Sequence, residues 1–206
     1  HMEQLSPMHP ARRRLAYDEI LSHQLALAIT REKQKAHQHA PLHAPKTYKD
    51  KILHALPFTL TQGQQDVLAE IEKDLQKSFL MCRLLQGDVG SGKTILAFLS
   101  AAYVIACGKQ AAIMAPTEIL ARQHYAGLLP LAEKTGLRIA LLTAREKGKA
   151  RQELLDNLAA GAIDLLIGTH ALIQDPVQFK DLALAIIDEQ HRFGVGQRLA
   201  LAQKGA

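Results

Sequence analysis

Residues 87–94 read Gly87-Asp88-Val89-Gly90-Ser91-Gly92-Lys93-Thr94, the complete pattern G-x-x-x-x-G-K-T. An apolar run at residues 79–85 precedes this stretch, and a helical pattern at residues 95–106 follows it. Glycines let backbone N–H groups converge on phosphate oxygens, and the following helix points its positive end at them. We therefore expect these eight residues to hold the phosphates of a nucleoside triphosphate. A ligand-free glycine-rich turn would not require all of these features together.

Two side chains of this loop have specific expected roles. Lys93 should reach the β- and γ-phosphates, and the Thr94 hydroxyl should ligate Mg²⁺. The loop therefore predicts both a nucleotide and a divalent cation as cofactors.

Length and composition favour one substantial domain with an appendage. The chain has 206 residues, of which 48% are hydrophobic, 4% are aromatic and none is Trp. No apolar run approaches the roughly 20 residues of a membrane span, so we expect no membrane partner. The N-terminus lacks the pattern of a secretory signal. We expect Cys82 and Cys107 to be reduced core residues, as is usual in a cytoplasmic protein.

The net charge of +5 is unevenly distributed. Residues 1–54 hold nine Lys or Arg against five Asp or Glu, together with seven of the ten histidines. A basic arm on a nearly neutral domain suggests a polyanionic partner. A solvated, positively charged linker explains the same charges equally well, so both interpretations stay open.

The order of elements predicts an α/β fold. Helical patterns occupy residues 11–40 and 49–55, and from residue 58 onward helices and strands alternate. The expected helices are 64–76, 95–106, 118–134 and 148–159, and the expected strands are 80–85, 111–114, 138–142, 164–167 and 183–187. Strands separated by helices form a mostly parallel sheet covered on both faces, which is a three-layer α/β domain. We divide the chain into a helical linker, residues 1–56, and this domain, residues 57–206.

Polar motifs follow several of the expected strands. They are the phosphate loop, Ala115-Pro116-Thr117, Gly168-Thr169-His170 and Asp188-Glu189. Because the carboxyl ends of parallel strands share one edge of the sheet, these motifs should lie together, where such sheets bind ligands.

Asp188 and Glu189 end an apolar strand about a hundred residues after the phosphate loop. Adjacent residues of a strand face opposite sides, so the pair must lie where the backbone turns. Asp188 can then hold Mg²⁺ through water, and Glu189 can orient and deprotonate an attacking water. Lys93, Asp188 and Glu189 are therefore the expected catalytic residues.

Phe58 and Gln64 are candidates for contact with a nucleotide base. A glutamine amide both donates and accepts, which matches the N6/N7 edge of adenine, and Phe58 can pack on the ring. Taken alone, Thr61 reads as a helix N-cap and Gln64 as a surface residue.

With these residues in place, the sequence resembles the superfamily 2 helicases, and most closely the RecG-type DNA helicases. The resemblance covers essentially the whole chain and implies a RecA-like P-loop NTPase domain that uses ATP and Mg²⁺. It rests on residues 87–94 (motif I), 115–124 (motif Ia), 167–174 (motif Ib), 188–195 with Gln197 and Arg198 (motif II, in the form DEQH), and the N-terminal helical segment at residues 9–19. The motor of transcription-repair coupling factors, the nearest competitor, is expected to carry DEEH.

The resemblance also implies contacts with DNA. Residues that it places along the DNA are Thr117, Arg122, Gln123, Thr169 and His170. His191 and Arg192 would relay the state of the γ-phosphate between ATP and DNA. A helix N-cap remains an alternative for Thr117, and a surface position for Arg122.

The implied parent is a monomeric bacterial, nucleoid-associated helicase that translocates on branched double-stranded DNA in recombination and repair. Its second motor domain, which supplies arginine fingers, and its wedge domain lie outside these 206 residues. We therefore expect this stretch alone to bind ATP–Mg²⁺ weakly, to hydrolyse it slowly or not at all, and not to unwind DNA. Two other classes stay open: a nucleic-acid or protein binding module that responds to ATP, and an RNA-directed helicase.

Overall fold

The computed structural model describes residues 9, 10, 12–14, 16–22, 24, 25, 39–194, 196, 197, 200, 201 and 204. The chain forms two compact units, one of residues 1–41 with 77–83 and one of residues 42–76 with 84–206. In the first unit residue 9 is not helical, whereas the described residues from 10 to 25 are helical, and Ile20, Leu21 and Leu25 are exposed. Residues 26–38 of the expected helix, and Leu15 of its apolar stripe, lie outside the described residues.

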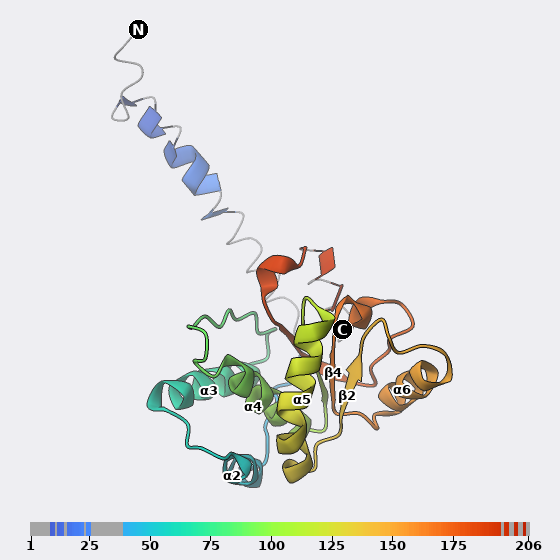
Figure 1. Cartoon of the computed structure of the whole chain (residues 1–206). Coiled ribbons are helices and arrows are strands. Elements are labelled where there is room, and N and C mark those ends of the chain that lie inside the picture. The colour runs from blue at the N-terminus through green and yellow to red at the C-terminus, as the bar shows by residue number, and fades with distance from the viewer. Residues whose placement is uncertain are drawn as a thin grey trace. The chain divides into compact units, whose positions relative to one another are not determined.

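The second unit contains a parallel sheet of four strands in the order β2-β3-β1-β4 (Figure 1). The strands are β1 (Gln110–Met114), β2 (Ile139–Leu142), β3 (Leu165–Gly168) and β4 (Leu182–Ile187), and all three pairings are parallel. Each of these strands lies within one residue of its expected position. The four strands confirm the predicted fold class.

The expected helices of this unit are all formed, although α2, α3 and α4 begin two or three residues before their expected starts. They are α2 (Lys46–Ala55), α3 (Gln62–Leu75), α4 (Lys93–Ala106), α5 (Glu118–Thr135) and α6 (Gly148–Ala160), followed by the short 3-10 helices η2 (His170–Ile173) and η3 (Gln190–Arg192). Thr61 caps α3 through a reciprocal pair of hydrogen bonds with Gln64, which stabilises the helix start. The alternative interpretation of Thr61 as an N-cap is therefore confirmed.

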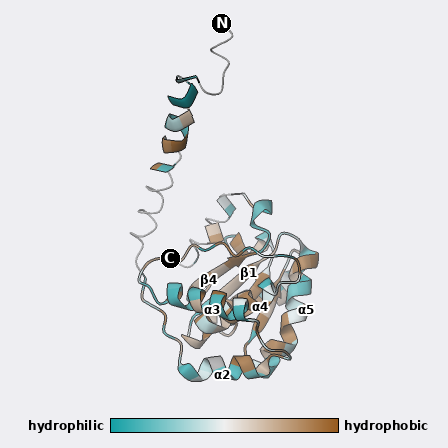
Figure 2. Cartoon of the chain, turned by 90° about the vertical axis from the view of Figure 1, so that its left-hand side faces the viewer, coloured by the Kyte–Doolittle hydropathy of each residue, from teal (hydrophilic) through white to brown (hydrophobic). Residues whose placement is uncertain are grey.

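Helices pack on both faces of the sheet. Ala112 and Met114 of β1 share a buried apolar cluster with Leu155 and Leu158 of α6. Helix α4 contacts β1 and β4, and α5 contacts β2 and β3, while α2 and α3 pack behind α4. The inner strands β1 and β3 are buried along their whole length, as a sheet covered on both faces requires. Figure 2 shows the apolar character of β1 and β4 between the helices.

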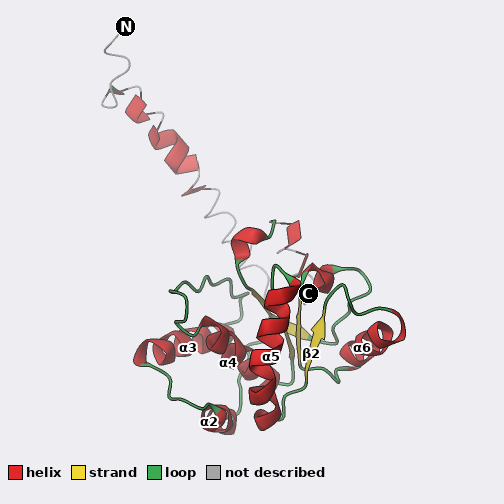
Figure 3. Cartoon of the chain, in the orientation of Figure 1, coloured by secondary structure: helices red, strands yellow, loops and turns green. Residues whose placement is uncertain are grey.

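The expected strand at residues 80–85 is not formed. Only Phe79 makes an isolated bridge, and Figure 3 draws the segment between α3 and α4 as loop. Leu80 and Leu84 are 48% and 58% exposed, so this apolar run is not buried against a neighbouring strand. Cys82, expected in the core because of that strand, is exposed, whereas Cys107 is half-buried. Apolar composition alone did not distinguish a strand from this loop.

Gly168 fixes the spacing of β2 and β3. It pairs with Leu142, and a Cβ at position 168 would collide with the Leu142 carbonyl oxygen and also press on the Leu172 side chain. The obstacle is backbone, which cannot rotate away, so a side chain here must separate the two strands.

We predict that Gly168→Ala lowers the free energy of unfolding by about 1–3 kcal/mol, the usual range for overpacking a core. Denaturant unfolding of the 206-residue chain measures this change. Gly127→Ala is the matched control, because Gly127 lies within α5 with nothing near its absent Cβ. That variant should gain about 0.5–1 kcal/mol from helix propensity. Equal effects of the two substitutions would contradict this account of Gly168.

Candidate functional site

Backbone hydrogen bonds join three of the sequence motifs at the carboxyl edge of the sheet. The Ala115 N–H donates to the Gly168 carbonyl at 2.8 Å, and the Asp188 N–H donates to the Met114 carbonyl at 2.9 Å. These bonds extend the ladder one residue beyond the strands. The residues that follow β1, β3 and β4 therefore lie side by side, as the parallel arrangement predicted.

The glycine-rich loop leads directly into α4. Gly90 and Gly92 have φ values of 80° and 87°, which the absence of a Cβ permits. Gly92 is the N-cap of α4, and no side chain caps the helix start. The first N–H groups of α4 and the positive end of its dipole are thus available to an anion.

Lys93, the first residue of α4, folds its side chain back over the loop. Its Nζ donates to the carbonyl oxygens of Gly87 at 2.6 Å and Asp88 at 2.7 Å. Ser91 and Thr94 are exposed, and Val89 is fully exposed. The ammonium group is therefore held against the loop by contacts that phosphate oxygens can replace.

Asp188 lies immediately beyond β4, and both of its carboxylate oxygens accept hydrogen bonds. Oδ2 accepts from Nε2 of His124 at 2.8 Å, and Oδ1 accepts from the Glu189 N–H at 3.0 Å. The hydrogen bond from His124 is the main reason that the pKa of Asp188 is lowered, with the charge of Lys93 adding to the effect. Asp188 is therefore an anion at neutral pH, within electrostatic reach of Lys93.

Glu189 has a left-handed backbone, with φ 48° and ψ 50°, and no other described non-glycine residue has a positive φ. This turn breaks the alternation of β4, as expected for two carboxylates with separate roles. The Glu189 carboxylate is about half exposed, and its Oε2 lies 3.4 Å from Nδ1 of His191. Strained conformations of this kind occur at functional sites.

Gln64 connects α3 to the glycine-rich loop. Its Oε1 accepts from the Thr61 N–H at 3.0 Å, and its Nε2 donates to the Ser91 carbonyl at 2.9 Å. A Cβ on Gly92 would meet this amide, which would have to move aside, whereas the positive φ of Gly92 is the constraint that favours glycine there. The Gln64 side chain is thus placed beside the phosphate loop.

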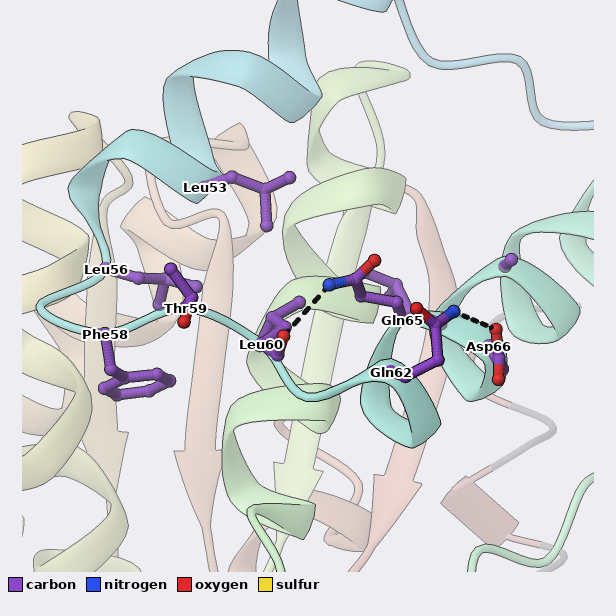
Figure 4. A pocket seen from close by; sticks show the side chains of 10 residues that line it. Leu53, Leu56, Phe58, Thr59, Leu60, Gln62, Gln65 and Asp66 are labelled. Atoms are coloured by element: carbon purple, nitrogen blue, oxygen red, sulfur yellow. Dashed lines mark hydrogen bonds between the residues drawn. The ribbon is translucent and has the colours of Figure 1, made fainter.

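Phe58 lines an open pocket between α2 and α3 of about 490 Å³ (Figure 4), and neither Gln64 nor a residue of the phosphate loop is among its lining residues. Leu53, Leu56 and Leu60 contribute apolar walls, and Gln62, Gln65 and Asp66 contribute polar groups. The Phe58 side chain is 49% exposed. Contact of Phe58 with a nucleotide base stays a prediction.

The expected DNA-contacting residues begin at the start of α5. Thr117 is its N-cap, because its Oγ1 accepts from the Leu120 N–H at 3.3 Å. The Arg122 guanidinium pairs with Glu118 at 3.0 Å and Glu146 at 3.5 Å. The N-cap interpretation of Thr117 is confirmed, and DNA contact by either residue stays a prediction.

The remaining expected residues lie after β3, after β4 and in the second turn of α5. Gln123 and His170 are exposed, Thr169 is only 5% exposed, and His191 and Arg192 lie exposed in η3. Val195 and Arg198, which completed the resemblance at motif II, lie outside the described residues. The structure adds one site residue that sequence reasoning missed, His124. The sequence carries no signal for it, because its partner Asp188 lies 64 positions away in the chain.

A comparison of the sequence with models of known protein families gives a match over most of the chain. Residues 61–204 match the model of the DEAD/DEAH box helicase family. The chain therefore belongs to the DEAD/DEAH box helicases, and membership of that family implies the use of ATP.

Similar proteins are RecG helicases. The chain is 49% identical over 197 residues to "ATP-dependent DNA helicase RecG" of Escherichia coli (strain K12), covering 96% of this chain and 28% of that protein. It is 50% identical over 196 residues to the protein of the same name from Bacillus subtilis (strain 168), covering 95% and 29%. It therefore spans somewhat more than a quarter of the length of these relatives.

A solved structure of RecG bound to three-way DNA junction superposes on this fold with a TM-score of 0.83 at 42% sequence identity. The match covers 89% of this chain and 25% of the other. Among the described residues, no helix has both the length and the apolar character needed to cross a bilayer.

Relief of the strained turn should be measurable. We predict that Glu189→Gly raises the free energy of unfolding by about 0.5–1 kcal/mol, because glycine adopts a left-handed conformation without the Cβ penalty. Glu189→Ala removes the same carboxylate but keeps a Cβ, and should give no such gain. Denaturant unfolding of both variants tests this, and a gain of the same size for Glu189→Ala would show that the carboxylate, rather than the backbone, is responsible.

Proposed function

We propose that this chain is the ATP-binding motor domain of a RecG-type DNA helicase, which couples ATP hydrolysis to translocation on branched DNA. The observation that carries the proposal is the convergence of the glycine-rich loop, Lys93 and Asp188 at one edge of the sheet. The named relatives are RecG helicases, which favours this parent over a transcription-repair coupling factor.

The loop binds the triphosphate through its backbone N–H groups and the start of α4. Lys93 exchanges the carbonyl oxygens of Gly87 and Asp88 for the β- and γ-phosphates. Phe58 and Gln64 contact the adenine, with Gln64 giving up its hydrogen bond to Ser91 to present its amide.

The donor set fits Mg²⁺. Thr94 supplies an exposed hydroxyl at the start of α4, and Asp188 supplies an ionised carboxylate that binds directly or through water. One or two such protein oxygens, together with phosphate oxygens, are the usual surroundings of Mg²⁺ at a nucleotide. An ion held by these residues would neutralise charge on the phosphates. Glu189, on its turn beside Asp188, orients the attacking water and accepts its proton.

DNA lies along the carboxyl edge, contacted by Thr117, Arg122, Gln123, Thr169 and His170. Hydroxyls, helix N-termini and exposed polar side chains are common phosphate contacts and carry no base information. Arg122 must exchange part of its pairing with Glu118 and Glu146 for a phosphate. His191 and Arg192 follow Glu189 directly and report the state of the γ-phosphate to this surface. The bound three-way junction of the solved RecG supports branched DNA as the substrate.

The wider assignments extend this proposal. We keep residues 1–56 as a linker to the rest of the parent protein, residues 57–206 as the motor domain, and a monomer as the working form. The bacterial relatives support a cytoplasmic location.

Nucleotide binding by the 206-residue chain tests the first step. We predict that Lys93→Ala weakens the binding of a fluorescent ATP analogue by about tenfold to a hundredfold, because a charged hydrogen bond contributes roughly 1.5–3 kcal/mol. Lys109→Ala is the control, since Lys109 pairs with Asp181 at the other edge of the sheet. Equal affinity of Lys93→Ala and the unaltered chain would refute the assignment of the phosphate loop.

Hydrolysis is tested in the full-length parent protein. We predict that Glu189→Gln abolishes turnover while ATP remains bound, because the amide cannot accept the proton of the attacking water. ATPase rates with forked, linear and single-stranded DNA, and with RNA, identify the nucleic acid. Unchanged turnover in Glu189→Gln would remove Glu189 from catalysis, and stimulation by RNA alone would favour an RNA-directed helicase.

A further inference from the structure

One polar contact at this site has no role in the function proposed above. His124, in the second turn of α5, donates from Nε2 to Oδ2 of Asp188 at 2.8 Å. A carboxylate only accepts hydrogen bonds, so Nε2 must carry the proton. The His124 side chain is 15% exposed and that of Asp188 is 34% exposed. The pair is therefore partly shielded from water, where a hydrogen bond to a charged group has a larger effect on orientation.

The fold brings these two residues together from distant parts of the sequence. Asp188 follows β4, and its N–H is bound to Met114, the last residue of the neighbouring strand β1. Three residues later Thr117 caps α5, and Ala121 of that helix is fully buried. His124 lies one turn beyond Ala121 on the same face and so points toward the end of β4.

The geometry leaves part of the Asp188 carboxylate available. Oδ2 accepts from His124 and Oδ1 accepts from the Glu189 N–H, and each carboxylate oxygen has two lone pairs. One lone pair on each oxygen is therefore left for a metal ion or its bound water. With both oxygens anchored, the carboxylate cannot rotate freely about its terminal bond.

We infer that His124 is a positioning residue, which holds the Asp188 carboxylate in the orientation that binds nucleotide-bound Mg²⁺. This inference rests on the proposed function, because it requires ATP and Mg²⁺ at the phosphate loop. The hydrogen bond from His124 also links α5, the helix that begins at the proposed DNA contact Thr117, to the metal-binding carboxylate. Partners of this kind behind a metal ligand commonly change metal affinity by about 10–100-fold.

The test measures magnesium-dependent nucleotide affinity, without hydrolysis. The dissociation constant of a fluorescent ATP analogue is determined for the 206-residue chain in EDTA and in excess Mg²⁺, and their ratio gives the magnesium enhancement. His124→Gln and His124→Asn form a matched pair of amides. The Gln amide nitrogen reaches about as far as Nε2 and can donate to Asp188, whereas the Asn amide is too short.

We expect His124→Asn and His124→Leu to lower the magnesium enhancement by about tenfold, with the affinity in EDTA unchanged. His124→Gln should restore most of it. His54→Leu, a change at an exposed histidine of α2 bonded to the Asp50 carbonyl, should have no effect. Circular dichroism shows which variants keep the fold. If His124→Leu does not fold, the comparison of His124→Asn with His124→Gln tests the inference.

Two results overturn the inference. Wild-type enhancement in His124→Asn would show that Asp188 needs no such anchor, and a larger enhancement would show that His124 competes with the metal ion. In either case, the proposed function is still supported if the chain binds nucleotide in EDTA and Lys93→Ala weakens that binding. If the unaltered chain binds no nucleotide, or binds it equally well after Lys93→Ala, the proposed function fails and this inference fails with it.

Discussion

The site depends on the parallel hydrogen-bond ladder continuing past the ends of the strands. The Asp188 N–H reaches the Met114 carbonyl, and the Ala115 N–H reaches the Gly168 carbonyl. Because these bonds are between main-chain atoms, they set the relative heights of the segments after β1, β3 and β4 whatever side chains those segments carry. Gly168 permits the close approach of β2 on one side. Polar residues that are up to about seventy positions apart in the sequence are thereby held close together in space at one edge of the sheet.

Charge is arranged around that edge in opposing groups. Lys93 is held by loop carbonyls at the positive start of α4, while Asp188 is kept ionised chiefly by the hydrogen bond from His124. The cation is suited to phosphate oxygens and the anion to a metal ion. Glu189 takes a strained backbone to place a second carboxylate beside the first. The stability given up in this turn is consistent with a catalytic role for its side chain.

Much of this was predictable from sequence, because local pattern and local structure agree. The apolar strands 111–114 and 183–187 and the glycine loop each carry their own signal, and the parallel fold then requires a common edge. Other features depend on tertiary contacts. Residues 80–85 have the composition of a strand but no partner strand, and the left-handed backbone of Glu189 has no signature in an Asp-Glu pair. The His124–Asp188 bond joins residues 64 positions apart, so only the tertiary structure, which brings the second turn of α5 to the residue after β4, reveals it.

The central claim is that a metal-bound nucleotide occupies the carboxyl edge between Lys93 and Asp188. Its most direct measurement is paramagnetic broadening of backbone amide signals in the ¹⁵N-labelled chain when the ATP analogue is added with Mn²⁺ in place of Mg²⁺. The account predicts selective loss of the Thr94, Asp188 and Glu189 signals, with the Lys109 and Asp181 signals at the opposite edge preserved. Broadening centred on Lys109 and Asp181, or broadening without preference for either edge, would contradict it.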